Sequence, residues 1–147
     1  MVAIKLDGER VASEFKDTLR KRITKLKHTS ITPGLGTILV GDDGPSKNYI
    51  ALKHLDCKDP GLHTEEIHLP STATQEEIIE AIETFNHDHQ IHAFIIQYPF
   101  PGDLNYESAL LKVLPEKDAD GLHPVNLGKL VQGIPAPLAS TPAGIQL

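Results

Sequence analysis

The sequence predicts an α/β domain with an open, mainly parallel sheet flanked by helices. Short apolar runs that suit buried strands alternate along the chain with longer segments in which apolar residues recur every three or four positions. Strands that alternate with helices usually pair in parallel, and the helices then cover the faces of the sheet. The length of 147 residues suits one domain with an adequate core.

The first two predicted elements are a helix and a buried strand. Asp7 can cap the helix, whose apolar residues follow at spacings of three and four: Val11, Phe15, Leu19, Ile23 and Leu26. Thr-Pro-Gly at 32–34 breaks this pattern. Residues 35–40, Leu-Gly-Thr-Ile-Leu-Val, are then largely apolar and predict a strand inside the core.

A turn, a second helix and a short strand are expected next. Residues 41–45, Gly-Asp-Asp-Gly-Pro, have the composition of a turn. Ser46 is placed to open a helix that continues until Pro-Gly at 60–61 stops it. A short strand is predicted at 66–69.

The third helix has a specific start signal. Thr74 and Glu77 have the spacing of a capping box, and the apolar side chains behind them are Ile78, Ile79, Ile82 and Phe85. Residues 93–96, Ala-Phe-Ile-Ile, predict another apolar strand. A short fourth helix is expected at about 106–113.

The parallel arrangement also predicts where a ligand binds. In open α/β sheets, ligands lie beyond the carboxyl ends of the strands. The strands at 35–40 and 93–96 end at Gly41 and Gln97. We therefore expect both strand ends to border one cleft, together with the helix that starts at Ser46.

The loop at 115–124, Pro-Glu-Lys-Asp-Ala-Asp-Gly-Leu-His-Pro, is close enough in sequence to form a wall of that cleft. Its prolines and glycine argue for a turning backbone and against a helix or a strand. An ordered loop with two acids, a lysine and a histidine suits a polar ligand. A solvated turn accounts for the same composition, because turns favour Asp and Gly.

Tyr49 and Lys53 are four residues apart on the second predicted helix, so their side chains share a face. A lysine in a partly dry cleft can transfer protons, because desolvation disfavours its charged form. A tyrosine beside it can hydrogen-bond the amine and offer its ring to a flat heterocycle. Ordinary surface decoration of a helix is the competing interpretation, since exposed lysines are common.

Gln97 opens a stiff segment, Gln-Tyr-Pro-Phe-Pro, directly after the strand at 93–96. Pro99 and Pro101 fix their own φ angles and hold the preceding residues extended. The Gln97 amide therefore points in a defined direction, and it both donates and accepts, which suits a pterin- or purine-like edge. An irregular strand end is an equally good interpretation.

Composition excludes several classes of function. The net charge of −6 argues against a nucleic-acid partner, and no run approaches the roughly 20 apolar residues of a membrane span. The single Cys57 excludes an intrachain disulfide, and no signal peptide is recognisable, so we expect a cytoplasmic protein. His87, His89 and His92 lack partners at convincing ligand spacing, so no metal site is predicted.

Together, these motifs resemble the N-terminal domain of the bifunctional methylenetetrahydrofolate dehydrogenase/methenyltetrahydrofolate cyclohydrolase family. The resemblance runs from about Leu6 to the last residue. It rests on several spaced motifs in the same order: Val40-Gly-Asp42, Ser46, Tyr49, Lys53, Cys57, Gly61, Gln97-x-Pro-x-Pro101, Lys117-Asp-x-Asp-Gly121, His123-Pro124, Asn126, Gly128 and Thr141-Pro-x-Gly144.

The resemblance implies a folate substrate and assigns roles to the residues named above. It makes Lys53 the catalytic lysine, which assists proton transfer and water attack at the one-carbon bridge. It implies that Tyr49 stacks on or orients the folate, and that Gln97 holds the lysine and the ring system in place.

The same resemblance separates the two acids of the loop. It makes Asp120 the anchor of the pterin edge and leaves Asp118 to hold the shape of the loop. Pro99 and Pro101 count among the substrate-binding residues that it implies.

By resemblance, residues 1–140 are the folate-binding catalytic domain and 141–147 begin an interdomain helix. The family continues with a Rossmann-like domain that binds NADP or NAD, and its members are homodimers through contacts that lie largely there. No glycine-rich dinucleotide fingerprint occurs in this chain, so we expect no cofactor-binding residue in it and no hydride transfer by this chain alone.

Two other kinds of function stay open at this point. A non-catalytic folate-binding module would use the same cleft without turnover. A protein-interaction domain would not need the cluster of Tyr49, Lys53 and Gln97 at all.

Overall fold

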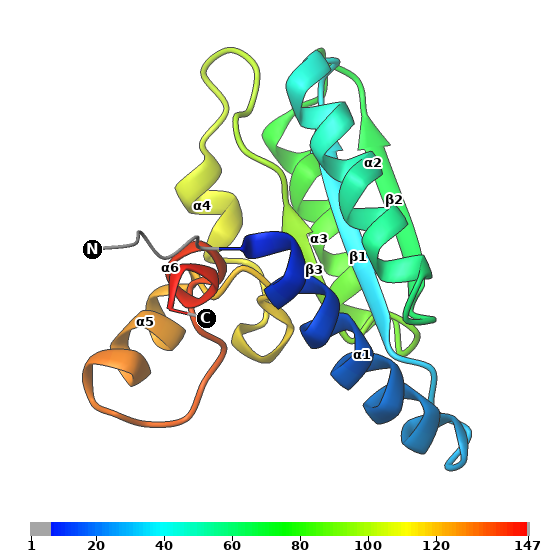
Figure 1. Ribbon diagram of the computed structural model, residues 1–147. Helices are drawn as coiled ribbons and strands as arrows, with labels where there is room; N and C mark the ends of the chain where they lie inside the picture. Colours follow the sequence, from blue (N-terminus) through cyan, green and yellow to red (C-terminus); the bar gives the residue numbers. More distant parts are fainter. Residues whose placement is uncertain (1–6, 147) are drawn as a thin grey trace, which may run out of the picture.

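The computed structural model describes residues 7–146 and contains a parallel sheet of three strands (Figure 1). The strand order is β2 (His63–Leu69), β1 (Gly34–Val40), β3 (Ala93–Ile96), so β1 lies between the other two strands of the described residues. Its register runs from Gly34 opposite His63 to Val40 opposite Leu69, and from Leu35 opposite Ala93 to Ile38 opposite Ile96. The predicted α/β class is confirmed.

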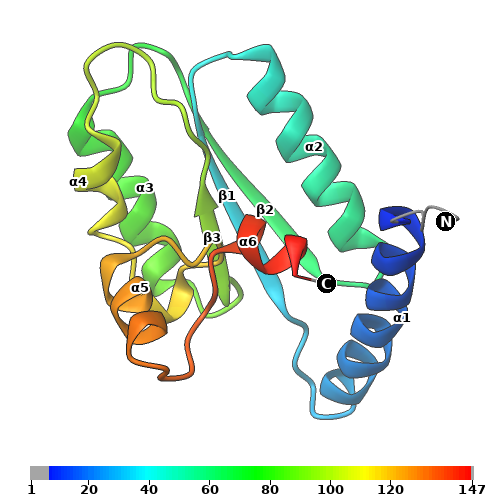
Figure 2. The same ribbon diagram turned by 60° about the vertical axis from the view of Figure 1, so that its left-hand side comes forward.

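Helices cover both faces of this sheet (Figure 2). On one face lie α1 (Gly8–Lys27) and α2 (Gly44–Lys58), and on the other lie α3 (Gln75–His87) and α4 (Tyr106–Leu110). The face under α3 carries the main core, in which the Phe85 and Phe94 rings lie 5.5 Å apart. The fully buried aliphatic side chains around them include Ile38, Ile78, Ile82 and Ile91.

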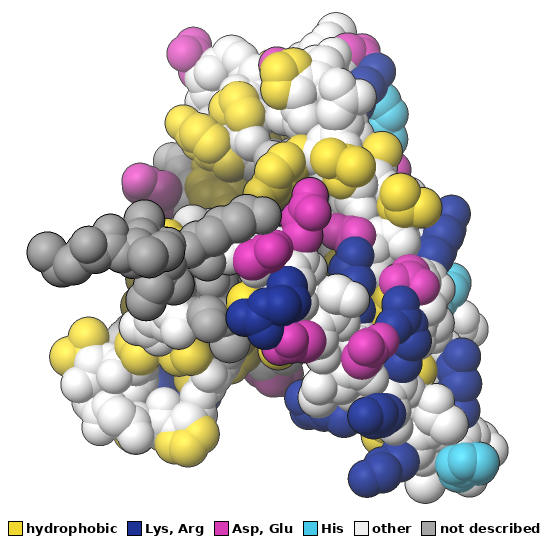
Figure 3. Space-filling view, in the orientation of Figure 1, with side chains coloured by type: hydrophobic (Ala, Val, Ile, Leu, Met, Phe, Trp, Pro, Cys, Tyr) yellow, Lys and Arg dark blue, Asp and Glu magenta, His cyan; other side chains and the backbone are white. Residues whose placement is uncertain are grey.

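α1 forms where the apolar periodicity predicts it, and Asp7 accepts a hydrogen bond from the Arg10 N–H at 3.1 Å. Its apolar stripe is only partly covered, since Ile23 is its one buried residue. Ion pairs tie it to α2: Lys16 with Asp56 at 2.6 Å and Arg20 with Asp59 at 2.5 Å. Acidic and basic side chains accordingly intermingle over these two helices (Figure 3).

Two element starts differ from the sequence prediction. α2 begins at Gly44, because Asp43 rather than Ser46 is the cap and accepts from the Ser46 N–H at 2.9 Å. β2 begins at His63 instead of residue 66, because the extended chain already pairs with β1 there. The capping box of α3 is confirmed, with Thr74 and Glu77 bonded in both directions.

The segment after β3 holds more helix than predicted. α4 is shorter than the expected 106–113, and the 115–124 loop contains a single 3₁₀ turn, η1 (Pro115–Lys117). Two helices follow, α5 (Pro124–Val131), which we did not predict, and α6 (Ser140–Ile145). Among the residues that the structure describes, no helix combines the length and apolar content that a membrane-spanning segment needs.

Asp118 anchors this segment to the sheet. Its carboxylate is buried and accepts hydrogen bonds from the Gly121 and His123 backbone N–H groups at 2.9 and 2.8 Å and from the Asn126 amide at 3.0 Å. The backbone beside it pairs with Phe94 of β3, and the Ala119 N–H donates to the Phe94 carbonyl at 3.2 Å. The predicted structural role of Asp118 is therefore confirmed.

We predict that Asp118→Ala destabilises the fold by about 3 kcal/mol, because three buried donors lose a charged acceptor. Urea unfolding followed by circular dichroism measures the change. Asp103→Ala is the matched control, since Asp103 is an exposed acid of a neighbouring loop and should change stability by less than about 0.5 kcal/mol. Equal effects of both substitutions would contradict the anchoring role.

Candidate active site at the carboxyl ends of the strands

A cavity of about 250 Å³ lies at the end of the sheet where β1 and β3 finish. α2, the segment after β3, the loop after η1 and the start of α6 enclose it. Its lining residues are Tyr49, Lys53, Ile96, Gln97, Tyr98, Tyr106, Asp120, Leu122, Ala139, Ser140, Thr141 and Pro142. Four of the six residues predicted for the site are among them.

Tyr49 and Lys53 do share a face of α2, but they meet through the aromatic ring. The Lys53 ammonium nitrogen lies 4.8 Å from the centroid of the Tyr49 ring, which is a cation–π distance. The Tyr49 side chain stays 58% exposed, so part of its ring is free to contact a flat ligand. The pair thus presents a cation and an aromatic surface side by side at the cavity.

Gln97 has one satisfied and one unsatisfied amide atom. Its Nε2 donates to the Tyr98 carbonyl at 2.7 Å, a bond within its own segment instead of the expected one to Lys53. Its Oε1 is buried and has no hydrogen-bond partner. A buried acceptor without a partner costs about 1–3 kcal/mol. A ligand N–H group in the cavity would remove that cost.

The two prolines of the segment lie in different places. Pro99 lines a neighbouring cavity of about 260 Å³ that shares Tyr49, Gln97 and Tyr98 with the first one. Pro101 lines neither cavity and packs against Gly41 instead, where its Cγ would lie 3.4 Å from a Cβ atom added to that glycine. Pro101 is therefore not placed to contact a ligand in either of these two cavities.

Asp120 lies at the cavity beside the first turn of α6. Its carbonyl accepts from the Ser140 N–H at 3.0 Å, and its Oδ1 accepts from the Ser140 hydroxyl at 3.3 Å. The next residue, Gly121, has φ +67°, and a Cβ atom there would lie 2.3 Å from the Leu138 carbonyl group. Only glycine therefore lets the chain cross closely enough for α6 to close this side of the cavity.

Tyr106 is a lining residue that the sequence did not indicate. It is half-buried, its ring packs edge-on against Tyr98 and Phe100 at 5.3 and 5.4 Å, and its hydroxyl lies 3.5 Å from the Ile96 carbonyl. Burial, with Asp120 and Asp118 nearby, raises the pKa of Tyr106 to about 12. The hydroxyl is therefore a protonated donor at neutral pH. Nothing in the local sequence marks Tyr106 apart from its place at a helix start.

Comparison with known proteins decides the family. The profile of the tetrahydrofolate dehydrogenase/cyclohydrolase catalytic domain matches residues 6–120. The chain belongs to this family. The match ends at Asp120, so the α6 wall of the cavity lies outside it.

Curated members of the tetrahydrofolate dehydrogenase/cyclohydrolase family align along almost the whole chain. The bifunctional protein FolD of Syntrophotalea carbinolica is 47% identical over 146 residues, which are 99% of this chain and 50% of that protein. FolD of Geotalea daltonii is 40% identical over 142 residues, 97% of this chain and 51% of that protein. The chain therefore spans about half the length of the curated relatives it matches.

Solved structures of family members have the same fold. FolD from Campylobacter jejuni superimposes with a TM-score of 0.87 at 33% identity, over 90% of this chain and 47% of that one. A methylenetetrahydrofolate dehydrogenase from the silkworm Bombyx mori gives a TM-score of 0.91 at 30% identity, over 95% and 49% of the two chains.

The three histidines considered for a metal site, His87, His89 and His92, do not line this cavity. His89 and His92 border a different cavity at the opposite end of the sheet, near the start of the strands, and His87 lies at the end of α3. Within residues 7–146, no group of three His, Cys, Asp or Glu side chains has an arrangement that could hold a metal ion.

We predict that Tyr106 ionises only at strongly alkaline pH. Its pKa of about 12 lies above the value of about 10 for an unfolded chain, so the unfolded state loses this proton first. Stability therefore falls as pH rises from about 10 towards 12, and Tyr106→Phe should lessen that fall. Tyrosinate absorbance and thermal melts from about pH 9 to 11 test this. Tyr98→Phe is the control, and equal alkaline sensitivity in all three proteins would contradict it.

We also predict that Gly121→Ala opens the cavity. An alanine there has an unfavourable positive φ and a Cβ clash with backbone, at a combined cost of about 2 kcal/mol or more. The crossing segment at Leu138 must move away, which separates Ser140 from Asp120. Hydrogen exchange of the Ser140 amide should accelerate, whereas Gly128→Ala, which meets no atom within 4 Å, should leave it unchanged. Unchanged exchange in Gly121→Ala would contradict the crossing constraint.

Proposed function

We propose that this chain is the folate-binding catalytic half of a methylenetetrahydrofolate dehydrogenase/methenyltetrahydrofolate cyclohydrolase. The observation that carries the proposal is the meeting of Lys53, Tyr49, Gln97 and Asp120 at one cavity beyond the strand ends. The Campylobacter jejuni structure, which is named for both activities, matches 90% of the chain. The substrate is a reduced folate with a one-carbon bridge.

Lys53 is the proton-transfer group of the hydrolysis. Water attacks the bridge carbon of 5,10-methenyltetrahydrofolate, a C–O bond forms, one C–N bond breaks and the product is 10-formyltetrahydrofolate, with release of one proton. The amine of Lys53 accepts a proton from the attacking water and returns one to the departing nitrogen. Tyr49 holds the lysine through its ring and orients the folate against its exposed face.

Gln97 and Asp120 fix the pterin. The partnerless Gln97 Oε1 is an acceptor for a pterin N–H, and the Asp120 carboxylate can accept two parallel N–H bonds from the same edge. Tyr106 adds a protonated donor beside them. Pro99 borders the adjoining cavity, and Pro101 supports the segment from behind through Gly41.

The dehydrogenase reaction belongs to the whole protein in this proposal. Oxidation of 5,10-methylenetetrahydrofolate needs NADP or NAD as the hydride acceptor, held by residues outside residues 1–140. A related enzyme from Trypanosoma brucei, 31% identical, was crystallised with NADP cofactor and an inhibitor. Residues 141–147, which include most of α6, lead towards that second domain, and the protein works as a homodimer in the cytoplasm.

We predict that Lys53→Met lowers methenyltetrahydrofolate hydrolysis by about 100-fold or more, the usual contribution of a positioned proton-transfer group. Loss of the methenyl absorbance, corrected for the spontaneous reaction, gives the rate in the purified chain. Lys58→Met is the control, because Lys58 lies on the same helix, is exposed and does not line the cavity. Equal rates in wild type and Lys53→Met would refute the assigned role.

Binding and turnover separate the enzyme from a non-catalytic module. Heat protection by folate that Asp120→Asn weakens, together with turnover that Lys53→Met abolishes, supports the enzyme. Protection without any turnover above the spontaneous rate supports the module. Absence of protection in the wild-type chain argues against a folate site altogether.

A further inference from the structure

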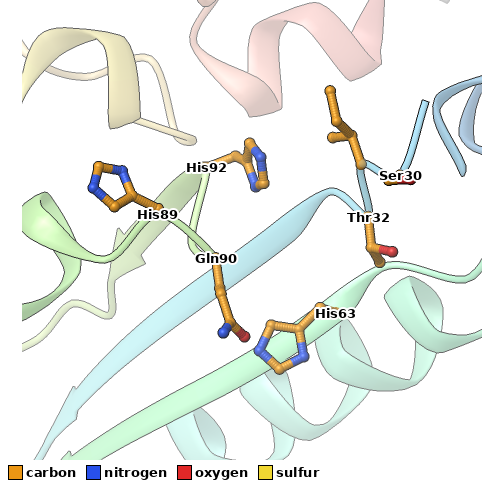
Figure 4. Close-up of a pocket in the computed structure, with 7 residues that line it drawn as sticks. Ser30, Thr32, His63, His89, Gln90 and His92 are labelled. Carbon is orange, nitrogen blue, oxygen red and sulfur yellow. The ribbon is translucent and has the colours of Figure 1, made fainter.

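The end of the sheet away from the folate cavity holds a second cavity, of about 500 Å³ (Figure 4). It lies where the three strands begin, and three separate segments line it: the α1–β1 loop, the first residue of β2 and the α3–β3 loop. Six of the seven lining residues are polar, Ile31 is the apolar one, and no acidic side chain lines the cavity. A cavity of this size is large enough for a small organic molecule.

His92 gives this cavity a fixed hydrogen-bond donor. The Gly34 backbone N–H donates to Nδ1 of His92 at 3.1 Å, so that nitrogen acts as an acceptor and carries no proton. The proton of the neutral ring is then on Nε2. A protonated nitrogen cannot ligate a metal ion, but it can donate to an oxygen. The tautomer therefore favours a ligand with acceptor atoms.

The base of the cavity holds this geometry rigidly. A Cβ atom on Gly34 would lie 1.9 Å from the Gln90 carbonyl oxygen, so β1 and the α3–β3 loop are in close backbone contact. The backbone N–H of His92 also donates to the Gly34 carbonyl at 2.9 Å. His92 is thus bonded to Gly34 of the central strand twice: its ring accepts from the Gly34 N–H, and its backbone N–H donates to the Gly34 carbonyl.

Other side chains that line the cavity also carry donors. The hydroxyls of Ser30 and Thr32 come from the α1–β1 loop, and the side chains of Gln90 and His63 point toward one another in Figure 4. Two acids lie near this group, and neither lines the cavity: Glu65, 3.8 Å from His63 Nε2, and Asp88, whose Oδ1 accepts from the Gln90 backbone N–H at 2.7 Å. His89 turns its ring away from the others (Figure 4) and is not needed.

Ser30 is an independent sign that this wall has a use. It has φ +61°, a left-handed conformation, and follows the end of α1, where glycine is the usual residue. The Ile31 N–H closes the turn onto the Leu26 carbonyl at 3.1 Å. A serine here costs stability relative to glycine, and it keeps a hydroxyl at the cavity. Backbone strain of this kind at a cavity wall points to function.

We propose that this cavity binds a small molecule through a phosphate or carboxylate group, with His92, Ser30, Thr32 and Gln90 as donors. The site is independent of the folate cavity and of the function proposed for it. Its ligand is an oxyanion because the polar side chains that line it offer donors, and no acidic side chain lines it.

Inorganic phosphate is the probe, titrated at constant ionic strength while the histidine ring signals are followed by NMR. We expect a saturable shift of the His92 and His63 signals with a Kd of about 1 mM or below, and none for His54, whose ring bonds Thr37. Acetate in a parallel titration distinguishes a carboxylate from a phosphate preference. Shifts that grow linearly without saturation, or that occur equally at His54, would overturn the proposal.

Three variants make the test specific. Ser30→Gly should raise the melting temperature yet weaken phosphate binding at least about threefold, and Gln90→Ala should weaken binding to a similar degree. Lys53→Met, which removes the cation of the other cavity, should leave the phosphate Kd unchanged. Unchanged binding in both Ser30→Gly and Gln90→Ala, or loss of binding in Lys53→Met, would place the phosphate elsewhere and refute the site.

Discussion

The parallel direction of three short strands is the constraint on which the rest of the molecule depends. Because β1 lies between β2 and β3, its seven residues carry the whole sheet, and every carboxyl end faces the same way. Gly41 and Gln97 therefore leave the sheet at the same end, and α2 starts at that end too. Covering both faces with helices leaves the two ends of the sheet as the places where loops gather and cavities form.

A buried carboxylate extends this frame past the last strand. Asp118 continues the edge of β3 through the backbone contact with Phe94 and gathers the N–H groups of the following turn. With that turn fixed, Asp120 lines the cavity beyond the strand ends, and α5 starts after His123. Asp118 thus determines the shape of the turn, and Asp120, two residues later, lies at the cavity.

The sequence predicted the parts of the fold whose signals are local. Periodicity located α1 and α3, and apolar runs located β1 and β3, because burial on one face leaves a pattern within a single element. α5 was missed because the contact that secures it, from Asn126 to Asp118, joins residues of different elements. The start of α2 was misplaced because Asp43 and Ser46 are both good capping residues, and only the structure distinguishes them.

The candidate site divides in the same way. Strand ends, helix spacing and family motifs were enough to predict that four residues meet at one cavity: Tyr49, Lys53, Gln97 and Asp120. Tyr106 and the wall formed by α6 could not: Tyr106 reaches the cavity through ring packing against Tyr98 and Phe100, and α6 through the close crossing at Gly121. The displacement of Pro101 to Gly41 likewise follows from the path of the segment and not from its composition.

Because ion pairs attach α1 to α2, we expect salt to affect the stability of the two ends of the sheet differently. The bridges from Lys16 and Arg20 to α2 lie at the surface, where such pairs contribute little and are screened within about 8–10 Å. α1 is thus a natural unit of partial opening. No residue of α1 lines the cavity at the carboxyl ends of the strands, whereas Ser30 and Thr32, which follow α1, line the cavity at the other end of the sheet. Raising the ionic strength should therefore increase the mobility of the cavity where the strands begin and leave the cavity at their carboxyl ends unchanged.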